Sequence, residues 1–167
     1  MSTLTATAQR FSHVAAGAGE TYDVVGELLT FKVTQADSGG ACLVLELCTR
    51  TGAGIPLHTH PSAESFTVLE GAFEFSGMQN DEPYVIHATP GDTVFIPAEA
   101  AHGYRAIEGD PARTVIVLTP GTEMERFFAE AGTRVEGDIP VLTTPDFPAM
   151  LAIAAKHGIV FAPPPEV

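Results

Sequence analysis

Basic side chains are scarce in this sequence of 167 residues. Eight lysines and arginines stand against 21 aspartates and glutamates, which gives a formal net charge of −13. Nucleic acids and anionic membrane surfaces are polyanions, and they attract proteins of the opposite charge. We therefore expect neither a nucleic acid nor a membrane as a partner.

Long apolar runs are also missing. The chain contains no stretch of about 20 apolar residues, the length that a membrane-spanning helix needs. Its first residues, MSTLTATAQRFSHV, lack the basic start and the apolar segment of a secretory signal. These absences predict a protein of the cytoplasm.

Cysteine is rare, and the two that occur are badly placed for a bridge. Cys42 and Cys48 lie in one apolar run. On a strand, at roughly 3.3 Å per residue, their Cα atoms would be about 20 Å apart. A disulfide needs about 4.4–6.8 Å between Cα atoms. We therefore expect two thiols, which suits a reducing compartment.

Glycine and proline are plentiful and punctuate the chain. The 16 glycines and 13 prolines separate short apolar segments at regular spacing. Eight to ten short strands with such turns are typical of a closed barrel or jelly roll. The pattern predicts an all-β jelly-roll barrel, of the kind called a double-stranded β-helix. We expect a flexible N-terminal arm at 1–20, the barrel at 21–121, and C-terminal helices and tail at 122–167, all in one domain.

Several turns and helix ends are predicted from single residues. Gly71 is expected to join two strands, 64–70 and 72–75, as a hairpin. A turn at 109–111 is expected to separate strands at 102–107 and 113–118. Two short helices should follow the barrel. The first starts at Thr122 with a capping box to Glu125, and the second covers 146–157.

The stretch from Gly52 to Gly71 carries the first chemical signal. It places His58 and His60 one residue apart and Glu64 four residues later. Alternate side chains on a strand point to the same face, so both imidazoles should project to one side of a sheet. After the turn at Pro61, Glu64 can return on the next strand. Imidazole and carboxylate converging on one point suit a divalent transition metal.

A second segment completes the pattern. The first stretch reads G-x5-H-x-H-x3-E-x6-G, and Gly91, Pro97 and His102 follow in GDTVFIPAEAAHGYRA. Together they resemble the two signatures of the cupin superfamily. Glu99 and Ala106 replace a glycine and an asparagine of the second signature, which shape a turn and end a strand. From about Tyr22 to Val135 the chain looks like the small single-domain quercetinase-like cupins.

The resemblance implies a metal centre and an activity. His58, His60, Glu64 and His102 would hold one divalent ion of Fe, Mn, Ni, Co, Cu or Zn. The group acts as dioxygenases on flavonol-type aromatics, with the glutamate as both ligand and general base, so Glu64 is also the catalytic candidate. Two alternatives stay open. One is an oxygen-independent isomerase, lyase or cyclase, and the other is a non-catalytic binder of small molecules.

Strand parity suggests which side chains surround the site. Phe66 and Val68 share the face of Glu64, and Tyr104 shares the face of His102. Phe95 is added as a further pocket residue. With few basic residues near the ligands, the expected partner is a small apolar organic molecule. The open sheet edges and the N-terminal arm predict a homodimer.

Overall fold

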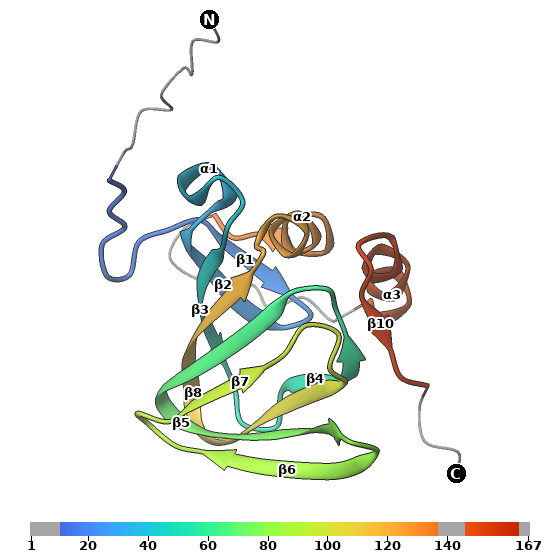
Figure 1. The fold of residues 1–167 in the computed structure, drawn as a ribbon. Coiled ribbons are helices and arrows are strands. Elements are labelled where there is room, and N and C mark those ends of the chain that lie inside the picture. The colour runs from blue at the N-terminus through green and yellow to red at the C-terminus, as the bar shows by residue number, and fades with distance from the viewer. Residues whose placement is uncertain (1–10, 137–145, 164–167) are drawn as a thin grey trace, which may run out of the picture.

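The computed structural model describes residues 11–136 and 146–163, and within them the chain is mostly antiparallel β-sheet (Figure 1). The predicted all-β, jelly-roll-like barrel is confirmed. Its strands are β1 (Thr21–Val24), β2 (Glu27–Val33), β3 (Leu43–Thr49), β4 (Gly54–Thr59), β5 (Ala63–Gln79), β6 (Glu82–Ala88), β7 (Thr93–Ile96), β8 (His102–Thr119), β9 (Thr133–Arg134) and β10 (Val160–Phe161).

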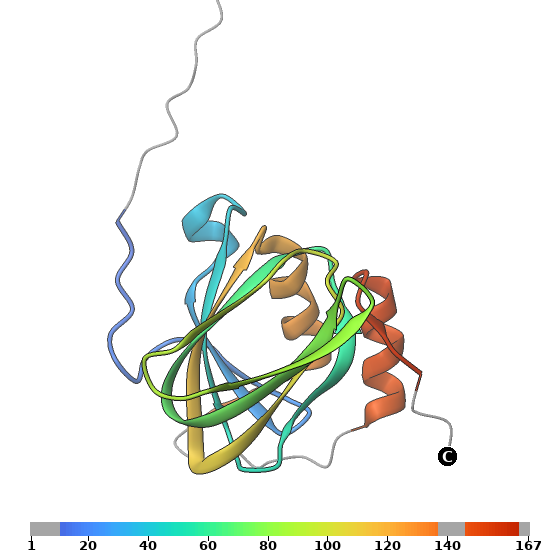
Figure 2. The same cartoon turned by 60° about the horizontal axis from the view of Figure 1, so that its bottom comes forward.

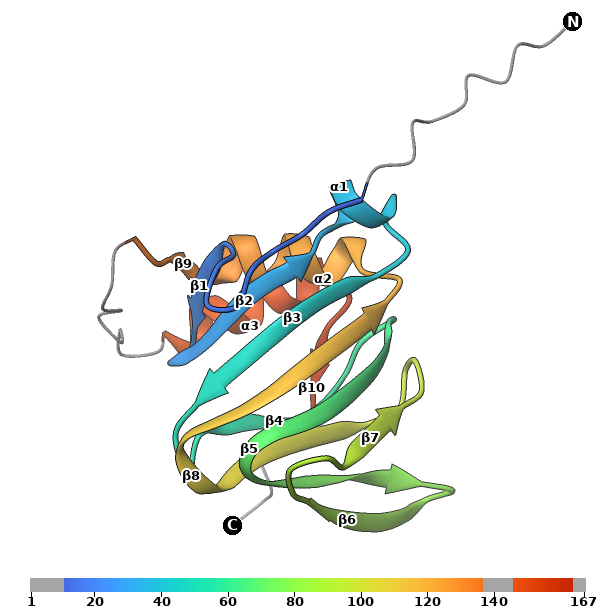
Figure 3. The ribbon, with the colours of Figure 1, turned by 90° about the vertical axis from the view of Figure 1, so that its left-hand side faces the viewer.

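Two long strands connect the whole sheet. β8 pairs with β3, β4 and β5, and β5 pairs in turn with β6, β7 and β8. Along the rest of the sheet, β3 continues through β2 and β1 to β9 (Figure 3). This arrangement brings β4, β5 and β8 together, which are the strands that carry the predicted ligands.

The predicted break at Gly71 is wrong, because β5 runs unbroken through it. Gly71 adopts a φ of +77°, and an added Cβ would lie 2.3 Å from the Glu108 carbonyl oxygen. The pairing with β8 shifts register here. As a result, Phe66 and Val68 point inward before the shift, and Phe73 does so after it. Gly71 therefore bends one strand instead of joining two.

The turn predicted at 109–111 is likewise part of one strand. β8 continues from His102 to Thr119, with Gly109 at a φ of +101° opposite the bend of β5. The two bends lie against each other, since an added Cβ on Gly109 would come 2.9 Å from the Gly71 Cα. The paired long strands therefore bend together.

Both C-terminal helices are present, as α2 (Thr122–Ala131) and α3 (Phe147–Lys156). The capping box predicted at Thr122 is wrong. Gly121 is the N-cap of α2 and makes no side-chain cap, while the Glu125 carboxylate accepts from the Gln35 backbone N–H. Gln35 begins a short helix, α1 (Gln35–Ser38).

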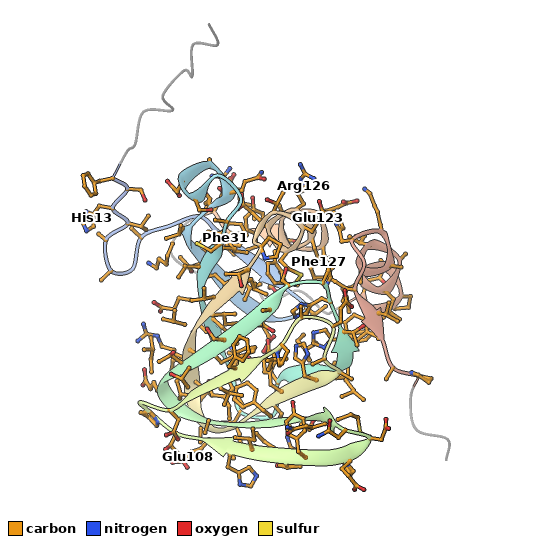
Figure 4. All side chains as sticks on the ribbon, viewed as in Figure 1. His13, Phe31, Glu108, Glu123, Arg126 and Phe127 are labelled. Carbon is orange, nitrogen blue, oxygen red and sulfur yellow. The ribbon has the colours of Figure 1, made fainter. Side chains whose placement is uncertain are left out.

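The helices lie across one end of the barrel (Figures 1 and 2). α2 contacts β1, β3 and α3, and it buries Met124 and Phe127. Phe127 lies on the side of α2 that faces the barrel, whereas Glu123 and Arg126 lie on the other side (Figure 4). No helix in the described parts of the chain has the length and hydropathy to cross a membrane.

The expected N-terminal arm lies partly outside the described residues. From residue 11 to the start of β1 the chain is largely exposed. Lys32 donates a hydrogen bond to the Ala15 carbonyl oxygen at 3.3 Å, which ties this segment to β2. The proline tail beyond residue 163 also falls outside the described residues.

Candidate metal centre and its cavity

Three of the predicted ligands meet on adjoining strands. His58 on β4 pairs directly with His102 on β8, and His60 follows the end of β4. One ring nitrogen from each lies within 4.8 Å of those of the other two. The exposed fractions are 8% for His58 and 1% for each of the others. The three imidazoles therefore form a buried cluster that could hold a metal ion.

The fourth predicted ligand, Glu64, contacts two of the three imidazoles. It lies near the start of β5 and is 6% exposed. Its Oε2 atom is 3.1 Å from His60 Nε2 and 3.2 Å from His102 Nε2. Strand parity thus placed Glu64 on the correct face.

Backbone carbonyls fix the orientation of two of the rings. His58 Nδ1 donates to the Pro56 carbonyl oxygen and His102 Nδ1 to the Ala100 carbonyl oxygen, each at 2.8 Å. In a neutral ring the Nε2 atom then carries a lone pair and no proton. If His102 is neutral, this lone pair faces a Glu64 oxygen at 3.2 Å, and a cation is needed between the two acceptors; without a metal ion, a proton on His102 Nε2 fills this place and donates to Glu64. This donor set fits a divalent transition metal.

The protonation states of two ligands favour metal binding. Burial, and then the neighbouring His102, lower the pKa of His58 to about 4, so its imidazole is neutral at neutral pH. Burial alone would raise the pKa of Glu64, but hydrogen bonds from His102 and His60 and their charges lower it to about 2. Both groups are therefore in the forms that bind metals.

The cluster lies beside a cavity of about 60 Å³ that is partly open to solvent. His58, His60 and Glu64 form its polar part, together with Glu27 of β2. The remaining lining side chains are apolar or aromatic, and none is a lysine or arginine. Its aromatic residues are Tyr104, Phe127, Phe128 and Phe161. The cavity is suited to an apolar molecule with few polar groups.

The C-terminal segment closes one side of this cavity. β10 pairs with β4, and Phe161 lies opposite His58 in that pairing. The two rings stack with centroids 5.3 Å apart. Residues of α2 and α3 complete the wall, including Met124 and Met150.

The predicted pocket residues have different outcomes. Tyr104 lines the cavity. Phe66 and Val68 are buried in the barrel core and do not line it, although the Phe66 ring packs 5.2 Å from that of Tyr104. The prediction that Phe95 lines the pocket is wrong. Its side chain is 65% exposed, because Val94 and Ile96 are the inward-facing residues of β7.

Among the residues of the cavity that sequence reasoning missed, Glu27 and Phe161 stand out, because one is charged and the other stacks on His58. Glu27 begins a strand directly after the turn at Gly26, where a charged residue is ordinary. Phe161 lies far from both histidine segments in sequence and reaches His58 only through the pairing of β10 with β4. No local pattern could have identified either residue.

The other histidines lie outside the cavity. His13 lies on the exposed N-terminal segment (Figure 4). His87 faces solvent and bonds Glu74 at 3.1 Å. His157 is buried, and its two ring nitrogens contact Glu123 at 3.3 Å and Glu130 at 2.8 Å. It therefore joins α3 to α2.

Comparisons with known proteins place this geometry in context. Residues 46–118 match the family model described as Cupin domain. A comparison with curated protein sequences found no match. The family match covers the strands that carry all four predicted ligands.

Two solved structures illustrate the shared fold, and a third is similar over a shorter part of the chain. KdgF from Halomonas sp. is 18% identical, with 70% of this chain and 99% of that chain covered and a TM-score of 0.57. The polyketide cyclase RemF from Streptomyces resistomycificus is 15% identical, with coverages of 81% and 91% and a TM-score of 0.56. A recombinant oxalate oxidase in complex with glycolate is 19% identical, with a TM-score of 0.49. That match covers 57% of this chain and about half, 51%, of the oxidase. The chain therefore contains a match to the Cupin domain at residues 46–118, and the solved structures show the same fold.

Proposed function

We propose that this protein is a metal-dependent dioxygenase that acts on a small, apolar aromatic molecule of the flavonol type. The observation that carries the proposal is the position of the histidine cluster. His58, His60 and Glu64 form part of the polar lining of an otherwise apolar cavity. A buried cluster with open space beside it is the arrangement of a catalytic metal centre, whereas structural centres are closed.

The lining of the cavity supports an aromatic substrate without negative charge. Four aromatic side chains face it, and they offer flat surfaces for stacking. No lysine or arginine lines the cavity, so it offers no side chain to neutralise a phosphate or carboxylate group of a substrate. A phosphorylated sugar is therefore a poor fit.

The ligands have defined roles in this proposal. His58, His60 and His102 hold the ion, and Glu64 completes the set. When bound, the ion supplies Lewis acidity and a position for a substrate oxygen. Glu64 Oε2, beside two imidazole nitrogens, is the atom that accepts the proton of the substrate hydroxyl. The apolar lining excludes water from the reacting atoms.

Elemental analysis tests the metal centre directly. The purified protein should contain a transition metal, and His60→Ala and Glu64→Ala should contain much less. His87→Ala is the matched control, because His87 also bonds a glutamate but lies on the surface. Equal metal content in all four proteins would show that the ion binds elsewhere.

Oxygen consumption tests the reaction. Protein loaded separately with Fe, Mn, Ni, Co or Cu is mixed with a flavonol, and oxygen uptake and product are followed. Uptake that depends on both the metal and His60 is the expected result. Absence of uptake with every metal would reject a flavonol dioxygenase.

An oxygen-independent enzyme is the second candidate. The match to the polyketide cyclase RemF covers 81% of this chain, which supports considering a cyclase, isomerase or lyase. Glu27 also gives the cavity a carboxyl group outside the ligand set. Turnover under strict anaerobiosis would support this candidate over the dioxygenase. Tight binding with no product in either condition would instead identify a non-catalytic binder.

A further inference from the structure

Glu27 is a buried carboxyl group that the predicted metal centre does not use. It begins β2, is 3% exposed and lines the same cavity as His58, His60 and Glu64. Its Oε2 atom accepts a hydrogen bond of 2.6 Å from the Tyr104 hydroxyl. Its Oε1 atom has no hydrogen-bond partner among the described residues. Glu27 is therefore a residue of the cavity wall with one buried carboxyl oxygen that accepts no full hydrogen bond.

The fold alone gives no reason for this arrangement. The Tyr104 hydroxyl needs one acceptor, and a neutral amide or hydroxyl would serve. A buried polar atom without a partner destabilises the folded protein. Burial also raises the pKa of Glu27 to about 7, although the hydrogen bond from the Tyr104 hydroxyl and a weaker contact with the Thr49 hydroxyl act to lower it. The Thr49 contact does not reach hydrogen-bond geometry, since Thr49 Oγ1 and Glu27 Oε1 are both without a hydrogen-bond partner. A residue that costs stability inside a binding cavity is a candidate for a binding role.

We propose that Glu27 anchors the ligand, and that its open Oε1 atom binds a hydroxyl group of an aromatic molecule in the cavity. This deepens the proposed function, on which it rests for the aromatic class of the ligand. The substrate would then carry two polar positions. One is the oxygen directed to the histidine cluster, and the other is a separate hydroxyl bound by Glu27.

A hydroxyl group suits Glu27 better than the alternatives. It can donate to the carboxylate and accept from the carboxylic acid, so it pairs with Glu27 in either state. An ammonium group would lose its hydration against one carboxyl in an apolar lining, which is unfavourable. A carboxylate on the ligand would repel Glu27 whenever both are ionised.

A pair of simple probes tests the anchor without relying on the metal or the reaction. Binding of 2-naphthol and naphthalene to metal-stripped protein is measured by fluorescence and calorimetry at pH 7. The wild type should bind 2-naphthol about tenfold more tightly than naphthalene, the effect of one hydrogen bond to an ionisable group. Failure to bind either compound, or equal binding of both, would overturn the proposal.

Two variants separate Glu27 from its neighbour. Tyr104→Phe keeps both oxygens of Glu27 and should retain the preference for 2-naphthol. The double variant Glu27→Leu with Tyr104→Phe removes both polar partners and should bind the two compounds equally. Glu74→Gln, a surface glutamate outside the cavity, is the matched control and should behave as the wild type. Loss of the preference in Tyr104→Phe alone would make the tyrosine the anchor and refute the assignment.

A stability measurement decides against a purely structural role. If Glu27 serves the ligand, the double variant should unfold at the same temperature as the wild type or higher, because it removes an unsatisfied group. If the double variant fails to fold, Glu27→Gln, which can still accept from Tyr104, replaces it in both assays. A markedly lower unfolding temperature in Glu27→Gln would show that the carboxyl supports the fold. Because the protein is metal-stripped, these outcomes do not depend on whether it consumes oxygen.

Discussion

Replacing Glu27 with glutamine should change how stability depends on pH. The pKa of Glu27 in the folded protein is about 7, against an ordinary value of 4.5. Between these values the folded protein keeps a proton that the unfolded chain has released. Raising the pH through this interval therefore destabilises the folded protein, and the contribution is complete only below the unfolded pKa. Glutamine does not titrate, so the variant does not lose stability for this reason as the pH rises.

The expected size follows from the shift. A shift of one pKa unit corresponds to about 1.4 kcal/mol, so the full effect is about 3 kcal/mol. Between pH 5 and 8, where part of the interval has already been passed, it is roughly 2.5 kcal/mol. The stability of Glu27→Gln relative to the wild type should rise by that amount. For a chain of this length, this equals a relative gain of roughly 5–10 °C in unfolding temperature.

The assay is denaturant and thermal unfolding of both metal-stripped proteins at four pH values from 5 to 8. His58 and Glu64 titrate at more acidic pH and are present in both proteins, so their effects cancel in the difference. Tyr104→Phe removes a bond that lowers the pKa of Glu27 and should move the effect to higher pH. A stability difference that stays constant from pH 5 to 8 would refute the reasoning about burial.

Three further predictions concern the cavity wall, the contact between α3 and α2, and the oligomeric state. Phe161→Ala removes the ring stacked on His58 and should lower stability by about 1–2 kcal/mol, less than for a fully buried ring; unfolding curves measure it. It should also weaken naphthalene binding, and unchanged affinity would mean that β10 is no wall of the site. His157→Gln should speed amide exchange in α3 more than in the barrel, whereas Lys156→Gln, whose side chain is exposed, should not. The homodimer expected from the sequence predicts twice the chain mass in light scattering, and a monomer at all concentrations would reject it.

The meeting of the four candidate ligands could be predicted from sequence because the signal is local. Parity on a strand fixes the direction of His58, and a short turn returns Glu64 to the same face. His102 needed a second segment with its own spacing. In each case, a few neighbouring residues determine where the side chain points, and the barrel then brings the faces together.

The predicted strand boundaries were wrong at glycines, because a glycine can either form a turn between two strands or bend one strand. A glycine between apolar segments predicts a turn, yet Gly71 and Gly109 bend two paired strands against each other. Only the tertiary pairing of β5 with β8 distinguishes these cases. The pocket prediction for Phe95 was wrong for a related reason. Every residue of Val94–Ile96 is apolar, so alternation could not tell the inner face of β7 from the outer one.

The cavity holds two carboxyl groups whose surroundings push them in opposite directions. The imidazoles of His60 and His102 hold the pKa of Glu64 far below its ordinary value, so Glu64 is ionised at every ordinary pH. An apolar environment raises the pKa of Glu27 to about 7. Two carboxyl groups whose pKa values differ this much can serve different chemical roles in one site. Glu64, always ionised, is suited to holding a cation and to the proposed acceptance of the substrate proton, and Glu27 is a second carboxyl whose protonation changes near neutral pH. A substrate hydroxyl bound at Glu27 would donate to its carboxylate and lower its pKa. Ligand binding near pH 7 should therefore release protons, and calorimetry in buffers of different ionisation enthalpy would measure that release.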